Sequence, residues 1–149
     1  MAIHLASDAG VSDYEINTSD VERALNLVLE GERRDSEPTI DVVLGSDDLL
    51  ARLNETYRGK AGSTDVLSFP LMDGVKAPND LLLGEIYISL QMASEQARDT
   101  DTSLEVELAR LVIHGALHLF GYDHVSDEDA QIMEPLGDRY HTAWRNGAP

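Results

Sequence analysis

The chain has 149 residues, of which 42% are hydrophobic, and we expect one domain, residues 1–149, with a sizeable core. It contains no cysteine, which excludes disulfide bonds and thiolate metal ligands. Its formal net charge of −17 argues against a generic nucleic-acid binder, but it leaves open a binder with a local basic groove. We interpret the acidity as a solvated surface, compatible with adaptation to high salt.

The apolar segments are short. None approaches the roughly 18 residues that a membrane span needs, and the first residues lack the basic segment and long apolar run of a secretion signal. We therefore expect a cytoplasmic protein with no membrane partner.

The first third of the chain alternates between strand and helix patterns. Residues 3–5 predict a short strand. Ser19 and Glu22 form a capping-box pattern at the start of a helix that Gly31 ends. Residues 39–44 predict a second strand, with alternate side chains on one side of it: Ile40, Val42 and Leu44.

Ser46 is expected to cap the next helix, whose apolar face comprises Leu49, Leu50, Leu53 and Tyr57. Two glycines make residues 58–63 a predicted loop. The segment 51–70 holds three basic and two acidic residues, and it is the only part of the chain that is not acidic.

Two further strands follow. Residues 66–69 predict a strand that Pro70 stops, which is typical of a sheet edge, where unpaired backbone groups can bind an extended substrate. Residues 71–80 are a predicted loop, and residues 81–90 are the next strand.

Three helices complete the chain, with predicted starts at Ser89, Ser103 and Ser126. The last is expected to be interrupted near Pro135 and to run to about Trp144. Helices and strands mix without a strict βαβ rhythm. This predicts an α+β fold with a small mixed sheet of about four strands packed with helices.

The most informative stretch contains His114, His118 and His124. On a helix, residues four apart lie one turn apart on the same face. Gly121 can end that helix in the left-handed conformation and return the chain so that the third imidazole meets the first two. Three imidazoles around one point suit a zinc-type ion with a fourth position left for water.

The spacing H-x-x-x-H-x-x-G-x-x-H is that of the metzincin peptidases, whose general-base glutamate follows the first histidine. Here that position is Gly115, which has no proton acceptor, so the spacing favours a metal site but not peptidase chemistry. Chance spacing, or a closed structural metal site, stays open as an alternative.

Three segments of this chain together resemble the bacterial YbeY family, in order and in spacing over roughly residues 40–135. They are His114-Gly-Ala-Leu-His-Leu-Phe-Gly-Tyr-Asp-His124, Leu53-Asn-Glu-Thr-Tyr-Arg58 with Thr64-Asp-Val-Leu-Ser-Phe-Pro70, and Leu83-Gly-Glu-Ile-Tyr-Ile-Ser89. The resemblance implies a zinc-dependent, single-strand-specific endoribonuclease. Its expected partners are single-stranded RNA and the small ribosomal subunit, with roles in maturation of the 16S rRNA 3′ end and in ribosome quality control.

The resemblance also implies residue roles: His114, His118 and His124 as ligands of one Zn²⁺ per chain, and Arg58 as the functional arginine. We expect Arg58 to neutralise charge that develops on phosphorus. The general base stays unidentified. Asp123 is better explained by capping the turn at Gly121, and a core-polar role for Glu107 is as good as a catalytic one.

Two other functions stay open. One is a metal-dependent hydrolase of another substrate, in which the peptidase form is disfavoured by Gly115. The other is a non-catalytic ribosome-assembly factor whose zinc only stabilises the fold, although three ligands rather than four argue against a closed site.

Overall fold

The computed structural model describes residues 2–5, 14–32, 37–76 and 80–147. Within these ranges the chain forms an α+β fold of four strands and five helices, which confirms the predicted fold class. In chain order the elements are β1 (Ala2–Leu5), α1 (Thr18–Glu32), β2 (Glu37–Gly45), α2 (Asp47–Arg58), β3 (Val66–Lys76), β4 (Asp80–Ser89), α3 (Leu90–Asp99), α4 (Leu104–Leu119) and α5 (Asp127–Arg145).

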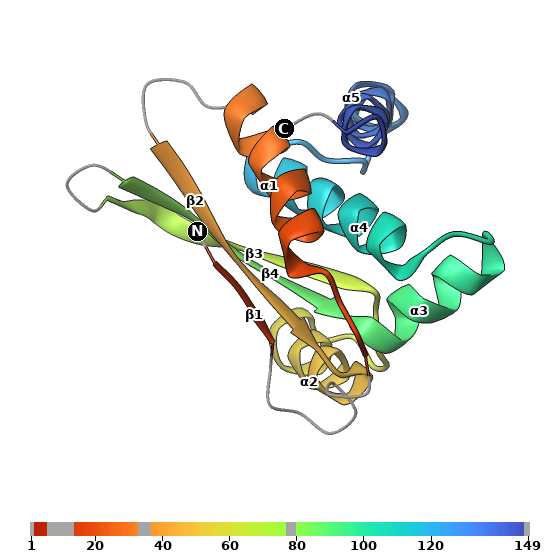
Figure 1. Cartoon of the computed structure of the whole chain (residues 1–149). Helices are drawn as coiled ribbons and strands as arrows, with labels where there is room; N and C mark the ends of the chain where they lie inside the picture. The colour runs from red at the N-terminus through yellow and green to blue at the C-terminus, as the bar shows by residue number, and fades with distance from the viewer. Residues whose placement is uncertain (1, 6–13, 33–36, 77–79, 148–149) are drawn as a thin grey trace.

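The sheet is mixed, with the strand order β1-β2-β4-β3 (Figure 1). β1 pairs with β2 and β2 with β4 in parallel, whereas β3 pairs with β4 antiparallel. β3 is therefore an edge strand of the described sheet, as the sequence predicts. Its outer side leaves backbone groups free to pair with another extended chain.

The long helix α4 is the central element of the helical layer. It packs against α1, α3 and α5 and against the strands β3 and β4, whereas α2 packs on β4, β3 and α3 (Figure 1). The predicted inner face of β2 is confirmed, because Ile40, Val42 and Leu44 are fully buried. None of the helices in the described ranges is long and apolar enough to cross a membrane.

The prediction that Pro70 stops its strand is wrong, and so is the predicted loop over residues 71–76 and at Asp80, whereas 77–79 lie outside the described residues. β3 continues through Pro70 to Lys76, and its pairing with β4 is irregular between Pro70 and Val75. Pro70 is exposed on an edge strand. The outer side of an edge strand has no partner strand, so a proline there costs no hydrogen bond between strands.

A second proline is also tolerated inside an element. α5 runs without a break through Pro135, so the predicted interruption is wrong. Pro135 lies on the exposed face of the helix, where solvent can satisfy the carbonyl group that loses its amide partner.

Two details of the helices differ from prediction. α1 begins at Thr18, and the side-chain oxygen of Asn17 accepts a hydrogen bond from the backbone N–H of Asp20, so Asn17 rather than Ser19 caps it. Tyr57, predicted on the apolar face of α2, is 68% exposed and touches the ring of Phe69 edge-on.

Gly84 marks a bulge in β4, beside the histidine-bearing helix. Leu82 pairs with Thr39 and Gly84 with Ile40, so Leu83 is the extra residue. Gly84 has φ +154°, and a Cβ built there would lie 2.2 Å from the carbonyl oxygen of Phe69. Only glycine lets β3 and β4 pair at this point.

We expect Gly84→Ala to lower the free energy of unfolding by about 1–3 kcal/mol, because the methyl group must push the two strands apart. Gly137→Ala is the matched control. Its Cβ would meet only Leu117 Cδ1 at 3.7 Å, within a helix where alanine is favoured over glycine by up to about 1 kcal/mol. Urea unfolding of both variants checks this, and equal stabilities would contradict the bulge argument.

Candidate metal centre

The position of α4 on the sheet fixes the direction of its two histidines. At Gly115 the helix approaches the strands so closely that an added Cβ would lie 3.0 Å from Ile86 Cγ2 and from Ser68 Oγ. The Ser68 hydroxyl donates to the Gly115 carbonyl oxygen at 3.1 Å. Gly115 thus faces the sheet, and a glutamate there would have no room, which adds a packing reason for its absence.

The segment after α4 brings the third histidine back. Gly121 has φ +102°, the left-handed conformation that the sequence predicts. The hydroxyl of Tyr122 donates to Glu32 Oε1 at 2.7 Å, which ties this turn to the end of α1. Asp123 Oδ1 accepts from the backbone N–H of His124 at 2.7 Å, which supports a turn-capping role for Asp123.

The three predicted histidines come together. One ligand atom from each of His114, His118 and His124 lies within 4.8 Å of the others. The ring centroids are 4.5 Å apart for His114 and His118, 5.4 Å for His114 and His124, and 5.1 Å for His118 and His124. This group could hold a metal ion.

Hydrogen bonding prepares one of these rings for a cation. The carbonyl oxygen of Tyr122 accepts from His118 Nδ1 at 3.0 Å, so the neutral ring carries its lone pair on Nε2. That atom lies 3.0 Å from His114 Nε2. Two nitrogens bound to one zinc ion at about 2.0–2.1 Å in tetrahedral geometry lie roughly 3.3 Å apart, so the pair fits an ion with a small outward shift.

Burial favours the neutral form of His114 and His118, which is the form that binds a metal. The pKa of His114 is lowered to about 4, chiefly by burial and then by the charges of His118, His124 and Arg110, against the opposing effect of Asp65. Burial also lowers the pKa of His118, against the opposing effect of the Tyr122 carbonyl.

A lowered pKa predicts how the metal-free protein responds to acid. Between the unfolded value of 6.5 and the folded value of about 4, the unfolded chain binds a proton at His114 that the folded chain does not. This contribution to stability is therefore complete above pH 6.5 and is lost as the pH falls toward 4.

We expect the metal-free wild type to lose more stability over this pH range than a metal-free His114→Gln variant. Thermal unfolding of both proteins in chelator between pH 7 and 4 checks the difference, since protonation of carboxylates affects both alike. Parallel curves would contradict the assigned shift.

The trio forms one wall of a cleft of about 620 Å³. Arg58 and Lys60 line the same cleft. Arg58 is the last residue of α2, and Gly59 ends that helix in the left-handed conformation with φ 65°. The charge of Arg58 is close enough to contribute to lowering the pKa of His118. The structure therefore brings all four predicted site residues to one cleft.

Two groups in this cleft were not predicted from the sequence. Asp65 lines it and accepts from Gln96 Nε2 at 3.2 Å, and its position inside the Thr64–Pro70 segment could have drawn attention to it. The second group is the backbone carbonyl of Tyr122, which every residue type has, so the sequence could not have indicated its role. Glu107, which the helical pattern placed with the histidines, is 4% exposed and forms an ion pair with Arg110.

Sequence comparison decides the family. The family profile "Endoribonuclease YbeY" matches residues 6–145. The chain belongs to the YbeY endoribonuclease family. An endoribonuclease YbeY of Parvibaculum lavamentivorans is 37% identical over 91% of this chain and 77% of its own length. The YbeY of Pseudomonas entomophila is 44% identical over 76% of this chain and 71% of its own.

A solved structure agrees with this membership. The solution structure of TM1509 from Thermotoga maritima is 32% identical and has a TM-score of 0.61, covering 99% of this chain and 95% of that one. The predicted resemblance to YbeY is confirmed, and the sheet and helices described above are those of a YbeY-like protein.

Proposed function

We propose that the chain is a metal-dependent endoribonuclease specific for single strands, with His114, His118 and His124 as the ligands of one Zn²⁺ per chain. One observation carries the proposal. Three imidazoles whose ligand atoms lie within 4.8 Å of one another form the wall of a 620 Å³ cleft that also contains Arg58. The family name adds the class of substrate.

The donor set fits zinc. Neutral imidazoles leave the full charge on the ion, and three protein ligands leave a position for solvent or substrate. When bound, such an ion supplies Lewis-acid chemistry and activates water for hydrolysis at neutral pH. His124 is exposed, so the trio is open to solvent at this residue and a substrate phosphate can reach a bound ion.

The residues of the cleft supply the rest of the chemistry. Arg58 offers a planar fork that binds phosphoryl oxygens and stabilises negative charge as the phosphodiester bond breaks. Lys60 adds a positive point charge in the same cleft, where it can contact another phosphate of the RNA backbone. Two carboxylates, Asp65 and Asp123, also line the cleft. Both already accept hydrogen bonds, Asp123 from the His124 amide and Asp65 from Gln96 Nε2, so neither is assigned as the general base.

By family resemblance, we infer that the RNA is ribosomal, that the chain acts in the cytoplasm on the 3′ end of 16S rRNA, and that it serves ribosome quality control with the small subunit as partner. Val66, Ser68 and Pro70 of the edge strand β3 line the cleft, so a single strand of RNA can lie along β3 there. The unpaired bases of a single strand are accessible to protein side chains, unlike those of a duplex.

A paired digest tests the proposal: single-stranded RNA beside casein, each with zinc and with chelator. We expect cleavage of RNA alone, abolished by chelator and restored by zinc. Cleavage of casein, or cleavage of RNA that chelator does not affect, would contradict it. A fourth protein ligand on the bound ion would favour the non-catalytic assembly factor instead.

A further inference from the structure

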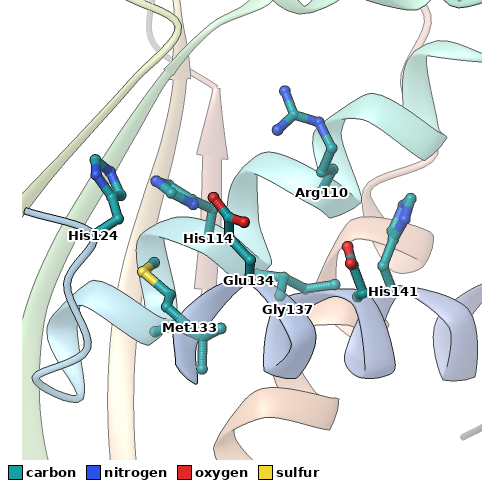
Figure 2. A pocket seen from close by; sticks show the side chains of 10 residues that line it. Arg110, His114, His124, Met133, Glu134, Gly137 and His141 are labelled. Carbon is teal, nitrogen blue, oxygen red and sulfur yellow. The ribbon is translucent and has the colours of Figure 1, made fainter. Parts of the chain in front are cut away.

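A second cavity opens on the other side of the histidine trio, between α4 and α5 (Figure 2). Its volume is about 250 Å³. That is smaller than the roughly 300–1,000 Å³ of pockets that hold drug-sized ligands, and suits a single ring system. Its inner wall is apolar, because Ile113, Leu117 and Met133 are at most 2% exposed and Gly137 presents no side chain.

The cavity and the cleft share two walls, His114 and His124. A group held in the cavity is therefore next to any group held at the trio. The two spaces differ in charge. In the cleft, Arg58 and Lys60 are balanced by Asp65 and Asp123, so a cation at the trio would make this space positive. The cavity is lined by two acidic side chains, Glu134 and Asp138, and by one basic side chain, Arg110. Because of this difference in charge, the cleft suits the phosphate of a nucleotide and the cavity suits its uncharged base.

The polar rim is partly held in place. The pair formed by Arg110 and the buried Glu107 orients the guanidinium, and His141 Nε2 donates to the Val106 carbonyl oxygen at 3.0 Å. Glu134 lies on the side of His114 and His124, as Figure 2 shows. Its carboxylate only accepts hydrogen bonds, so it suits a ring edge with N–H donors.

We propose that this cavity binds one guanine base of the RNA, next to the scissile phosphate. Guanine presents two adjacent donors, N1–H and the N2 amino group, which one carboxylate can accept together. The Watson–Crick edges of adenine, cytosine and uracil each place an acceptor beside a donor, which a carboxylate disfavours. The apolar inner wall takes the flat faces of the ring, as in enzymes that hold a turned-out base. The inference rests on the proposed RNA cleavage.

Binding is tested without catalysis, by following backbone amide NMR signals with guanosine 5′-monophosphate and with ribose 5-phosphate. We expect the nucleotide to shift Met133 and Gly137, and the sugar phosphate, which lacks the base, to leave them in place. Gly137→Leu fills the cavity and should abolish the shift of Met133, whereas Gln131→Leu, at an exposed site on the same helix, should keep both shifts. Shifts confined to the cleft, or unchanged in Gly137→Leu, would overturn the proposal.

A second variant does not depend on packing. Glu134 is exposed, and Glu134→Gln keeps its shape but replaces one acceptor with a donor. We expect the wild type to bind guanosine over adenosine monophosphate about 5- to 100-fold more tightly, as a good bidentate pair allows, and Glu134→Gln to lose most of that preference. An equal preference in both proteins would count against the assigned contact.

Cleavage of RNA separates this inference from the proposed function. Replacing the guanine beside the cut site by an abasic residue should lower kcat/KM roughly 10- to 100-fold in the wild type, the scale of losing one stacked base. An unchanged kcat/KM for the abasic RNA would overturn the guanine site but not the proposed function. Binding of the nucleotide in the cavity without any RNA cleavage would overturn the proposed function and leave the guanine site standing.

Discussion

The variant His118→Ala is expected to lose both its bound metal ion and its cleavage of single-stranded RNA. His118 is the best-oriented ligand of the trio, because the Tyr122 carbonyl fixes its Nδ1–H and directs the Nε2 lone pair toward His114. Changes to outer partners of a metal ligand already cost about 10- to 100-fold in affinity or activity. Loss of the ligand itself should cost more than that in both.

His141→Ala is the matched control for metal content. His141 is a half-buried histidine of α5. Its Nε2 donates a hydrogen bond to the Val106 carbonyl oxygen, and its ring stacks on Trp144. We expect it to keep its metal ion. Elemental analysis of the two variants, with circular dichroism to verify folding, makes the comparison. A His118→Ala protein that still cleaves RNA at the wild-type rate would refute the role assigned to the trio.

The variant Arg58→Ala should cleave RNA about 100- to 1,000-fold more slowly, the effect of removing one group that stabilises transition-state charge. Its metal content should stay that of the wild type, because Arg58 is exposed at the end of α2 and contributes no ligand atom. Single-turnover cleavage measured beside elemental analysis separates the two properties.

Two further variants control this experiment. Arg58→Lys keeps the charge but not the planar fork, so an intermediate rate is expected. Arg52→Ala removes the same charge from an exposed position on α2 outside the cleft, and its rate should be close to that of the wild type. Equal losses for Arg52→Ala and Arg58→Ala would show that net charge, rather than a contact in the cleft, is what matters.

Local sequence signals predicted much of this fold. Alternation in β2 placed Ile40, Val42 and Leu44 in the core, and serine caps located the starts of α2, α3, α4 and α5. The errors arise where tertiary context overrides a local rule. Pro70 and Pro135 are tolerated because one lies on a sheet edge and the other on an exposed helix face.

The histidine trio was predictable for a different reason. The spacing of His114 and His118 on one helix fixes their direction, and Gly121 permits the return of His124. Contacts between distant segments carry no such signal. The Glu32 carboxylate accepts from Tyr122 and Tyr140, residues about 90 and 108 positions away, and this anchoring is visible only in the folded chain.

The acidity of the chain has a local exception at the site. The net charge of −17 repels RNA, whereas in the cleft Arg58 and Lys60 balance Asp65 and Asp123 beside the histidines. Few phosphates can then be neutralised. Binding of RNA should therefore depend less on salt than in basic nucleases, because the salt dependence grows with the number of phosphate contacts.

The measurement that bears most directly on the central claim is the metal content of the purified protein by elemental analysis, paired with cleavage of a ribosomal 3′-end RNA with and without chelator. We predict one zinc ion per chain, loss of the ion and of cleavage together in chelator, and recovery of both when zinc is returned. A protein that holds no ion yet cuts this RNA would contradict the account, as would one whose ion can be removed without any change in the rate.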